Sequence, residues 1–115
     1  MLRFGTIESV NPPYVKVKFD DADSMGSYNL AVVMPFTLDD KACWYLTKGT
    51  QVACLMDENS EEGVVLGAIY SEADPVPIND LNKFYMEFKD GTIIEYDKEN
   101  HTLSADVKGS AEIIA

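Results

Sequence analysis

Residues 88–107, FKDGTIIEYDKENHTLSADV, alternate between apolar and polar side chains on either side of a turn. Such alternation is typical of β-strands that bury one face only. The pattern continues through residues 81–115, with turn residues such as Asp90-Gly91 between the expected strands. The segment therefore predicts a series of short strands that each have one apolar side.

The apolar sides of these strands are the expected core of an assembly. They carry Phe84, Met86, Phe88, Ile94, Tyr96, Leu103, Ala105, Val107 and Ile113. Ordering this segment costs free energy, because conformational entropy is lost. Burial of its 12 large apolar side chains returns less free energy than that, so the segment is not stable alone. The segment must therefore pack on the rest of the chain or be completed by copies of itself.

SEADPVPIND (71–80) favours completion by copies, because a proline-rich spacer tends to hold its ends apart. Self-association would also pair the exposed strand edges. We therefore predict an N-terminal domain at 1–72, a linker at 73–80 and an oligomerising β segment at 81–115.

The N-terminal domain reads as all-β. VKVKF (15–19) places Val15, Val17 and Phe19 on one face and two lysines on the other, as in a half-buried antiparallel strand. Further strands are expected at 4–10, 28–36, 51–57 and 63–70, and a short helical turn within 37–51. Five strands in about 70 residues predict a small Greek-key barrel such as an OB-fold, with the strand order left open.

The charge of the chain argues against nucleic acid as a partner. The 115 residues include 20 acidic and 9 basic side chains, and both 1–75 and 76–115 are net acidic. Nucleic-acid affinity depends mainly on clustered lysine and arginine. With no apolar run of about 20 residues and no signal-peptide pattern, the sequence predicts a soluble chain that is not exported.

Candidate metal and ligand sites have plainer explanations. The acidic run at 20–27 suggests calcium but lacks the full EF-hand pattern. His101 is expected in an exposed turn, although three copies about an axis could still form a metal site. Trp44 and Tyr45 could stack on bases, but the acidic domain favours their burial in the core or in a subunit contact.

Cys43 and Cys54 are expected to be free core cysteines. Asp39-Asp40 and Glu61-Glu62 are expected to be solvated. The sequence has no pairing of nucleophile and base, no phosphate-binding loop and no metal cluster. We therefore expect no enzyme activity, no catalytic or metal-binding residue and no cofactor.

Four stretches resemble the family of the phage tail baseplate assembly protein V, the central spike of contractile tails, whose relatives include type VI secretion spikes. FGTIESVNPPYVKVKF resembles the two opening strands of the family, and WYLTKGTQVACLM its tryptophan and G-x-Q-V segment. EEGVVLGAIYSEADPVP is similar to the strand and proline-ending exit of its barrel. The opening segment, 88–107, looks like the first repeats of its β-helix.

This resemblance implies an OB-fold barrel followed by a triple-stranded β-helix, or prism, built by three chains. In the family, the homotrimer sits in the virion tail baseplate, where the barrels meet the hub and tube proteins. Sheath contraction then drives the prism through the host envelope. The spike contacts the host membrane only during this penetration. The apolar residues named above, from Phe84 to Ile113, would form the prism core and trimer interface.

Longer family members end in a His-x-His tip that binds iron, whereas this chain has one histidine. Either the sequence is truncated or a separate tip protein of the proline-alanine-alanine-arginine (PAAR-like) type caps the prism. Its contact would involve Ala111, Glu112, Ile113, Ile114 and Ala115. Two other functions stay open: a spike or effector-carrying adaptor of a type VI-like secretion system, and an OB-type module for oligosaccharide or single-stranded nucleic acid.

Overall fold

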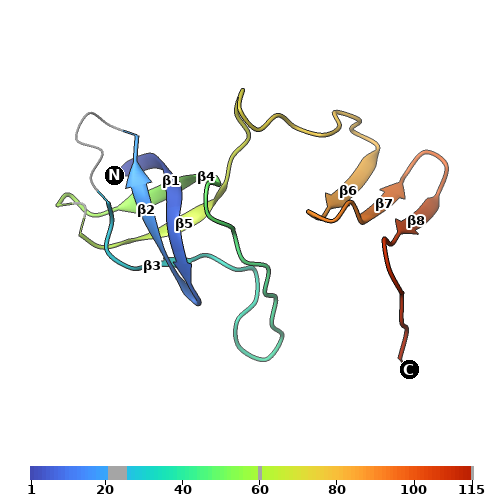
Figure 1. The fold of residues 1–115 in the computed structure, drawn as a ribbon, viewed down its shortest axis with the longest axis horizontal. Helices are drawn as coiled ribbons and strands as arrows, with labels where there is room; N and C mark the ends of the chain where they lie inside the picture. Colours follow the sequence, from blue (N-terminus) through green and yellow to red (C-terminus); the bar gives the residue numbers. More distant parts are fainter. Residues whose placement is uncertain (21–25, 60, 115) are drawn as a thin grey trace. The chain divides into compact units, whose positions relative to one another are not determined.

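The computed structural model describes residues 1–20, 26–59 and 61–114, and within these ranges the chain forms strands and no helix (Figure 1). The expected all-β class is confirmed, and the helical turn expected within 37–51 is wrong. The chain divides into two compact units, Met1–Pro75 and Val76–Ala115, which we call the barrel unit and the C-terminal unit. The division falls inside the proline-containing stretch 73–80.

The barrel unit is a closed barrel of five strands. These are β1 (Leu2–Asn11), β2 (Tyr14–Phe19), β3 (Leu30–Val32), β4 (Gln51–Met56) and β5 (Gly63–Ala68). Their order is β1-β2-β3-β5-β4, and pairing of β1 with β4 closes the barrel. All neighbours are antiparallel except β3 and β5, which are parallel. This arrangement is consistent with an OB-like barrel.

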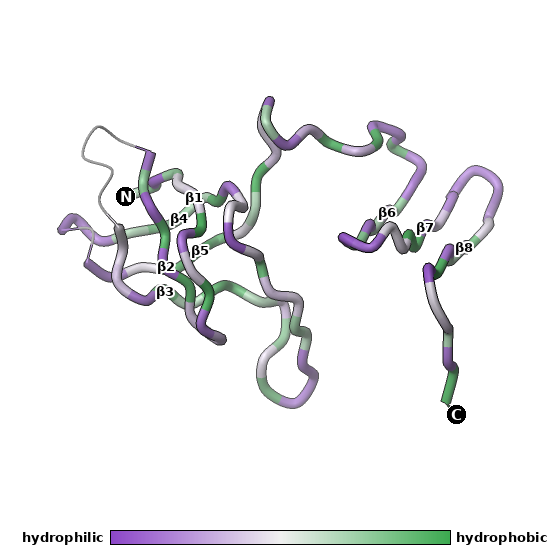
Figure 2. Tube along the Cα trace, viewed as in Figure 1, coloured by the Kyte–Doolittle hydropathy of each residue, from purple (hydrophilic) through white to green (hydrophobic). Residues whose placement is uncertain are grey.

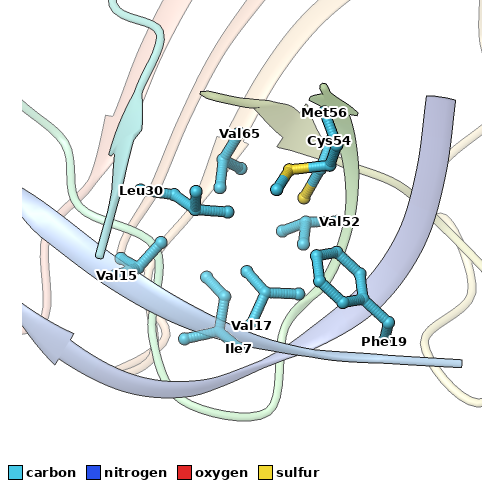
Figure 3. Close-up of a cluster of buried hydrophobic side chains, with 9 residues drawn as sticks. All are labelled: Ile7, Val15, Val17, Phe19, Leu30, Val52, Cys54, Met56 and Val65. Carbon is cyan, nitrogen blue, oxygen red and sulfur yellow. The ribbon is translucent and has the colours of Figure 1, made fainter. Parts of the chain in front are cut away.

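The core lies entirely inside this barrel. Figure 3 shows its nine buried side chains converging: Ile7, Val15, Val17, Phe19, Leu30, Val52, Cys54, Met56 and Val65. On β2 the buried and exposed positions alternate as the sequence predicts, with the two lysines outside. Gly5 on β1 is also buried, and a Cβ atom there would lie 2.6 Å from the carbonyl oxygen of Lys18. A glycine is therefore needed for β1 and β2 to approach closely.

β3 is shorter than the strand expected at 28–36. It covers Leu30–Val32, and one further backbone bond runs from the Val33 N–H to the Val65 carbonyl oxygen at 2.9 Å. Pro35 has no N–H to continue a ladder, so pairing stops before it. Residues 33–50 then form a long loop that connects β3 to β4.

The C-terminal unit is a three-stranded antiparallel sheet. It contains β6 (Lys83–Glu87), β7 (Ile93–Asp97) and β8 (Thr102–Asp106) in the order β6-β7-β8. The turn between β6 and β7 contains Gly91, whose φ of 92° suits glycine. Figure 2 shows hydrophobic and hydrophilic stretches along the strands of both units. Residues 111–114 form no strand, contrary to the expectation for the terminal AEIIA.

Candidate functional site

One face of the C-terminal sheet carries only aliphatic and aromatic side chains. The pairing register sets Phe84 opposite Tyr96 and Tyr96 opposite Leu103. It likewise sets Met86 opposite Ile94, and Ile94 opposite Ala105. Because directly paired residues of neighbouring strands point to the same side, these six side chains share one surface. We call it the apolar face.

The opposite face of the sheet is mainly polar. It carries Lys83, Tyr85, Glu87, Ile93, Glu95, Asp97, Thr102, Ser104 and Asp106. Lys83 Nζ lies 3.0 Å from Glu95 Oε1, and the Tyr85 hydroxyl donates to Glu87 Oε1 at 2.6 Å. The second bond favours the neutral phenol and raises the pKa of Tyr85 to about 12. These interactions, which the sequence pattern alone did not reveal, suit a surface exposed to water.

The turns of this sheet are fixed by aspartate side chains. Asp90 Oδ1 accepts a bond from the Thr92 N–H at 2.9 Å. Asp97 Oδ1 accepts from the Glu99 N–H at 2.9 Å, and Asp97 Oδ2 from Asn100 Nδ2 at 3.0 Å. The bonds from Thr92 and Asn100 hold the pKa of Asp90 and of Asp97, respectively, below the ordinary range. The two turns thereby set the register that gathers the apolar side chains.

The apolar face is not covered within the C-terminal unit. Phe84 is 55% exposed and Leu103 is 70% exposed, and none of the residues described between Val76 and Ile114 is fully buried. Solvent exposure of a continuous apolar surface is unfavourable and typically marks a site of protein contact. The sheet is thus one wall of a core whose other walls the C-terminal unit does not supply.

No protein-family model matches the chain, and no curated protein matches it. The remaining residues of the expected prism core lie outside the strands: Phe88 follows β6, Val107 follows β8, and Ile113 is almost fully exposed in the C-terminal segment. Of the expected tip contact, residues 111–114 are exposed and Ala115 lies outside the described residues.

On the loop 33–50, the expected core position of Cys43 is wrong, and Trp44 and Tyr45 do not take the core position that was one of their two expected places. Cys43 is exposed, so only Cys54 is a core cysteine, and both are free. Trp44 and Tyr45 are also exposed, at 56% and 40%, which rules out their burial in the barrel core. The loop leaves the barrel after β3 and carries these three residues outside the core. For Trp44 and Tyr45, a place in a subunit contact stays a prediction.

The other residues considered for metal or catalysis lie on the surface. His101 occupies an exposed turn with a φ of 54°, and Asp39, Asp40, Glu61 and Glu62 are exposed, as expected. Across residues 1–20, 26–59 and 61–114, no group of three histidine, cysteine or acidic side chains is arranged to hold a metal. Most of the acidic run 20–27 lies outside the described residues.

Proposed function

We propose that this chain is a structural protein that forms the homotrimeric central spike of a contractile phage tail or tail-like particle. The observation that carries the proposal is the face of the β6-β7-β8 sheet that holds only aliphatic and aromatic side chains and that the C-terminal unit leaves uncovered. Three copies of this sheet, facing one axis, would make a prism whose interior is closed by identical walls. The resemblance of the sequence to baseplate spikes supplies the number three.

The polar face of the sheet supports an arrangement in which the apolar face points to the axis and the polar face points to water. A prism wall needs an outer surface that tolerates water, and the ion pair between Lys83 and Glu95 and the bond between Tyr85 and Glu87 provide one. Both edge strands, β6 and β8, have unpaired backbone groups along one side in the single sheet. Pairing them with neighbouring copies would satisfy these groups and remove the edges that favour aggregation.

In this role the barrel units attach to the tube hub, and the prisms point toward the host envelope. A prism of interlocked strands resists bending and peeling, because no strand can leave without breaking bonds to its neighbours. Such rigidity is the property that a puncturing device needs. In the proposed particle, a PAAR-like protein caps the C-terminal segment 111–115, of which residues 111–114 are exposed.

Light scattering of the purified full-length chain tests the proposal. We expect a mass of about three times the 12.8 kDa chain, unchanged on dilution. A fragment of residues 1–75, which keeps the closed core of the barrel unit, is expected to stay folded and to lose most of the association. A full-length monomer at all concentrations would contradict the proposal. Immunogold labelling of tail-like particles should then mark the distal end of the tail.

A further inference from the structure

The barrel unit has an apolar surface of its own, on the outside of β1, β4 and β5. Leu2 pairs with Leu55, and Leu55 with Val64, so these three side chains form a row across the strands. Phe4 lies in the next outward position of β1, and Leu66 is the additional residue of the bulge in β5. We call this surface the β1-β4-β5 face.

The large side chains of this surface are about half exposed. The exposed fractions are 55% for Leu2, 48% for Phe4, 50% for Leu55 and 47% for Leu66. A strand of a solvated barrel normally places polar side chains outward. β2 follows that rule with Lys16 and Lys18, whereas β4 and β5 carry no charged residue at all.

β1 contains two charged residues. Neither lies on the outward surface of β1 beside β4. The Arg3 guanidinium lies 3.8 Å from the centre of the Phe19 ring, a buried core side chain. Glu8 lies beyond the stretch Leu2–Thr6 that pairs with β4. The face is therefore both apolar and uncharged, in a chain in which a quarter of the residues are charged.

The net charge indicates which partner such a face would fit. Residues 1–75 contain 12 acidic and 5 basic side chains, so barrel units of identical chains repel one another over most of their surface. An uncharged surface is one place where two copies can meet without opposing like charges. The β1-β4-β5 face meets that condition, and it offers apolar area to bury.

We propose that the β1-β4-β5 face is a contact between the barrel units of identical chains in the assembled spike. This inference rests on the proposed trimer. Stable interfaces bury about 800 Å² on each partner, more than four half-exposed side chains provide. The contact is therefore weak alone and forms because assembly of the C-terminal units raises the local concentration of barrels.

Cysteine cross-linking of the full-length chain tests this contact. In a Cys43→Ser background, which removes the exposed thiol, Leu2, Phe4, Leu55 and Leu66 are each replaced by cysteine, singly and in pairs. Lys16→Cys, on the outside of β2, is the matched control. Oxidation or a short bismaleimide should produce covalent dimers from at least one face variant, at a rate roughly tenfold or more above the control. Both sets of thiols are tethered by the trimer, but only the proposed contact would hold the face thiols of neighbouring chains close together.

Light scattering of the same samples distinguishes failure of the proposed barrel contact from failure of the proposed trimer. Trimers that cross-link no faster through the face than through Lys16→Cys would overturn this inference and leave the proposed spike intact. Monomers would overturn both. Each variant changes an outward side chain, and a thermal unfolding curve matching that of the Cys43→Ser parent verifies that the barrel has folded.

Discussion

Phe84 on β6 lies directly opposite Tyr96 on β7, and both rings belong to the apolar face of the C-terminal sheet. The next residue, Tyr85, points to the other side and bonds to Glu87. Two adjacent aromatic residues are thus assigned to opposite environments in the proposed spike, one in the interior of the prism and one on its surface.

Replacing each of these neighbours with serine should therefore have very different effects. We expect Phe84→Ser to weaken the trimer by about 2 kcal/mol or more per chain, since it removes a central apolar contact, and Tyr85→Ser to change it little. Sedimentation over a dilution series measures the dissociation. Equal weakening by both substitutions would contradict the assignment of the two faces.

Gly5→Ala should destabilise the barrel. The added Cβ would lie 2.6 Å from the Lys18 carbonyl oxygen and 2.5 Å from Val17 Cγ1, so the strands must move apart. Overpacking of this kind costs about 1 to 3 kcal/mol. Gly26→Ala is the matched control, because its nearest neighbour, Glu8 Oε2, would lie at an ordinary 3.6 Å. Denaturant titration of fragment 1–75 measures both, and an unchanged midpoint for Gly5→Ala would refute the prediction.

Low pH should reduce the stability of the C-terminal sheet, because it protonates the aspartates that hold the turns. Hydrogen bonds hold the folded-state pKa values of Asp90 and Asp97 below those of the unfolded chain. The contribution of these two carboxylates to the stability of the sheet is therefore fully present above the unfolded-state pKa of about 4. It is lost as the pH falls through their folded-state pKa values. Hydrogen exchange of the β6-β7-β8 amides, measured from pH 6 to pH 3 and corrected for intrinsic rates, should show reduced protection at the acid end.

Asp97→Ala should remove part of this acid dependence, since the acceptor for Asn100 is gone. Glu99→Gln removes the same charge without removing that acceptor and serves as the control. Acid dependence that is the same in the parent and in Asp97→Ala would show that the turn carboxylate does not contribute.

The two thiols should differ in reactivity. Cys43 is exposed, whereas Cys54 is buried, and burial raises the pKa of the Cys54 thiol although the charge of Arg3 opposes the rise. Thiolate is the reactive form, so a disulfide reagent should modify one thiol per native chain rapidly and the second only after unfolding. Cys43→Ser should abolish the rapid phase. Two rapid thiols in the native protein would contradict the burial of Cys54.

The sequence was most informative where side chains alternate. Val15, Val17 and Phe19 mark β2 and its buried face, and the strands of the C-terminal sheet follow the same rule. The order of the barrel strands could not be predicted, because β3 pairs with β5 and β1 with β4 across long stretches of chain. Local patterns do not encode such pairings.

Residue type alone does not predict burial where an apolar side chain stays exposed. For Trp44, the core alternative is wrong because its loop lies outside the barrel core, and a place in a subunit contact stays a prediction. The continuous apolar run of β4 was read as a strand, but the outward position of Leu55 became evident only from its pairing with Leu2. Burial depends on which neighbours a strand acquires, which composition does not specify.

Closure of the barrel by β1 and β4 joins residues about fifty positions apart, whereas the β6-β7-β8 sheet pairs residues close in the chain. The barrel can nevertheless complete its folding as a first-order process, because all nine core residues belong to one polypeptide. In the proposed spike, the C-terminal sheet must instead encounter two other chains. Its maturation then becomes a concentration-dependent step, so the rate of synthesis governs how quickly finished spikes accumulate.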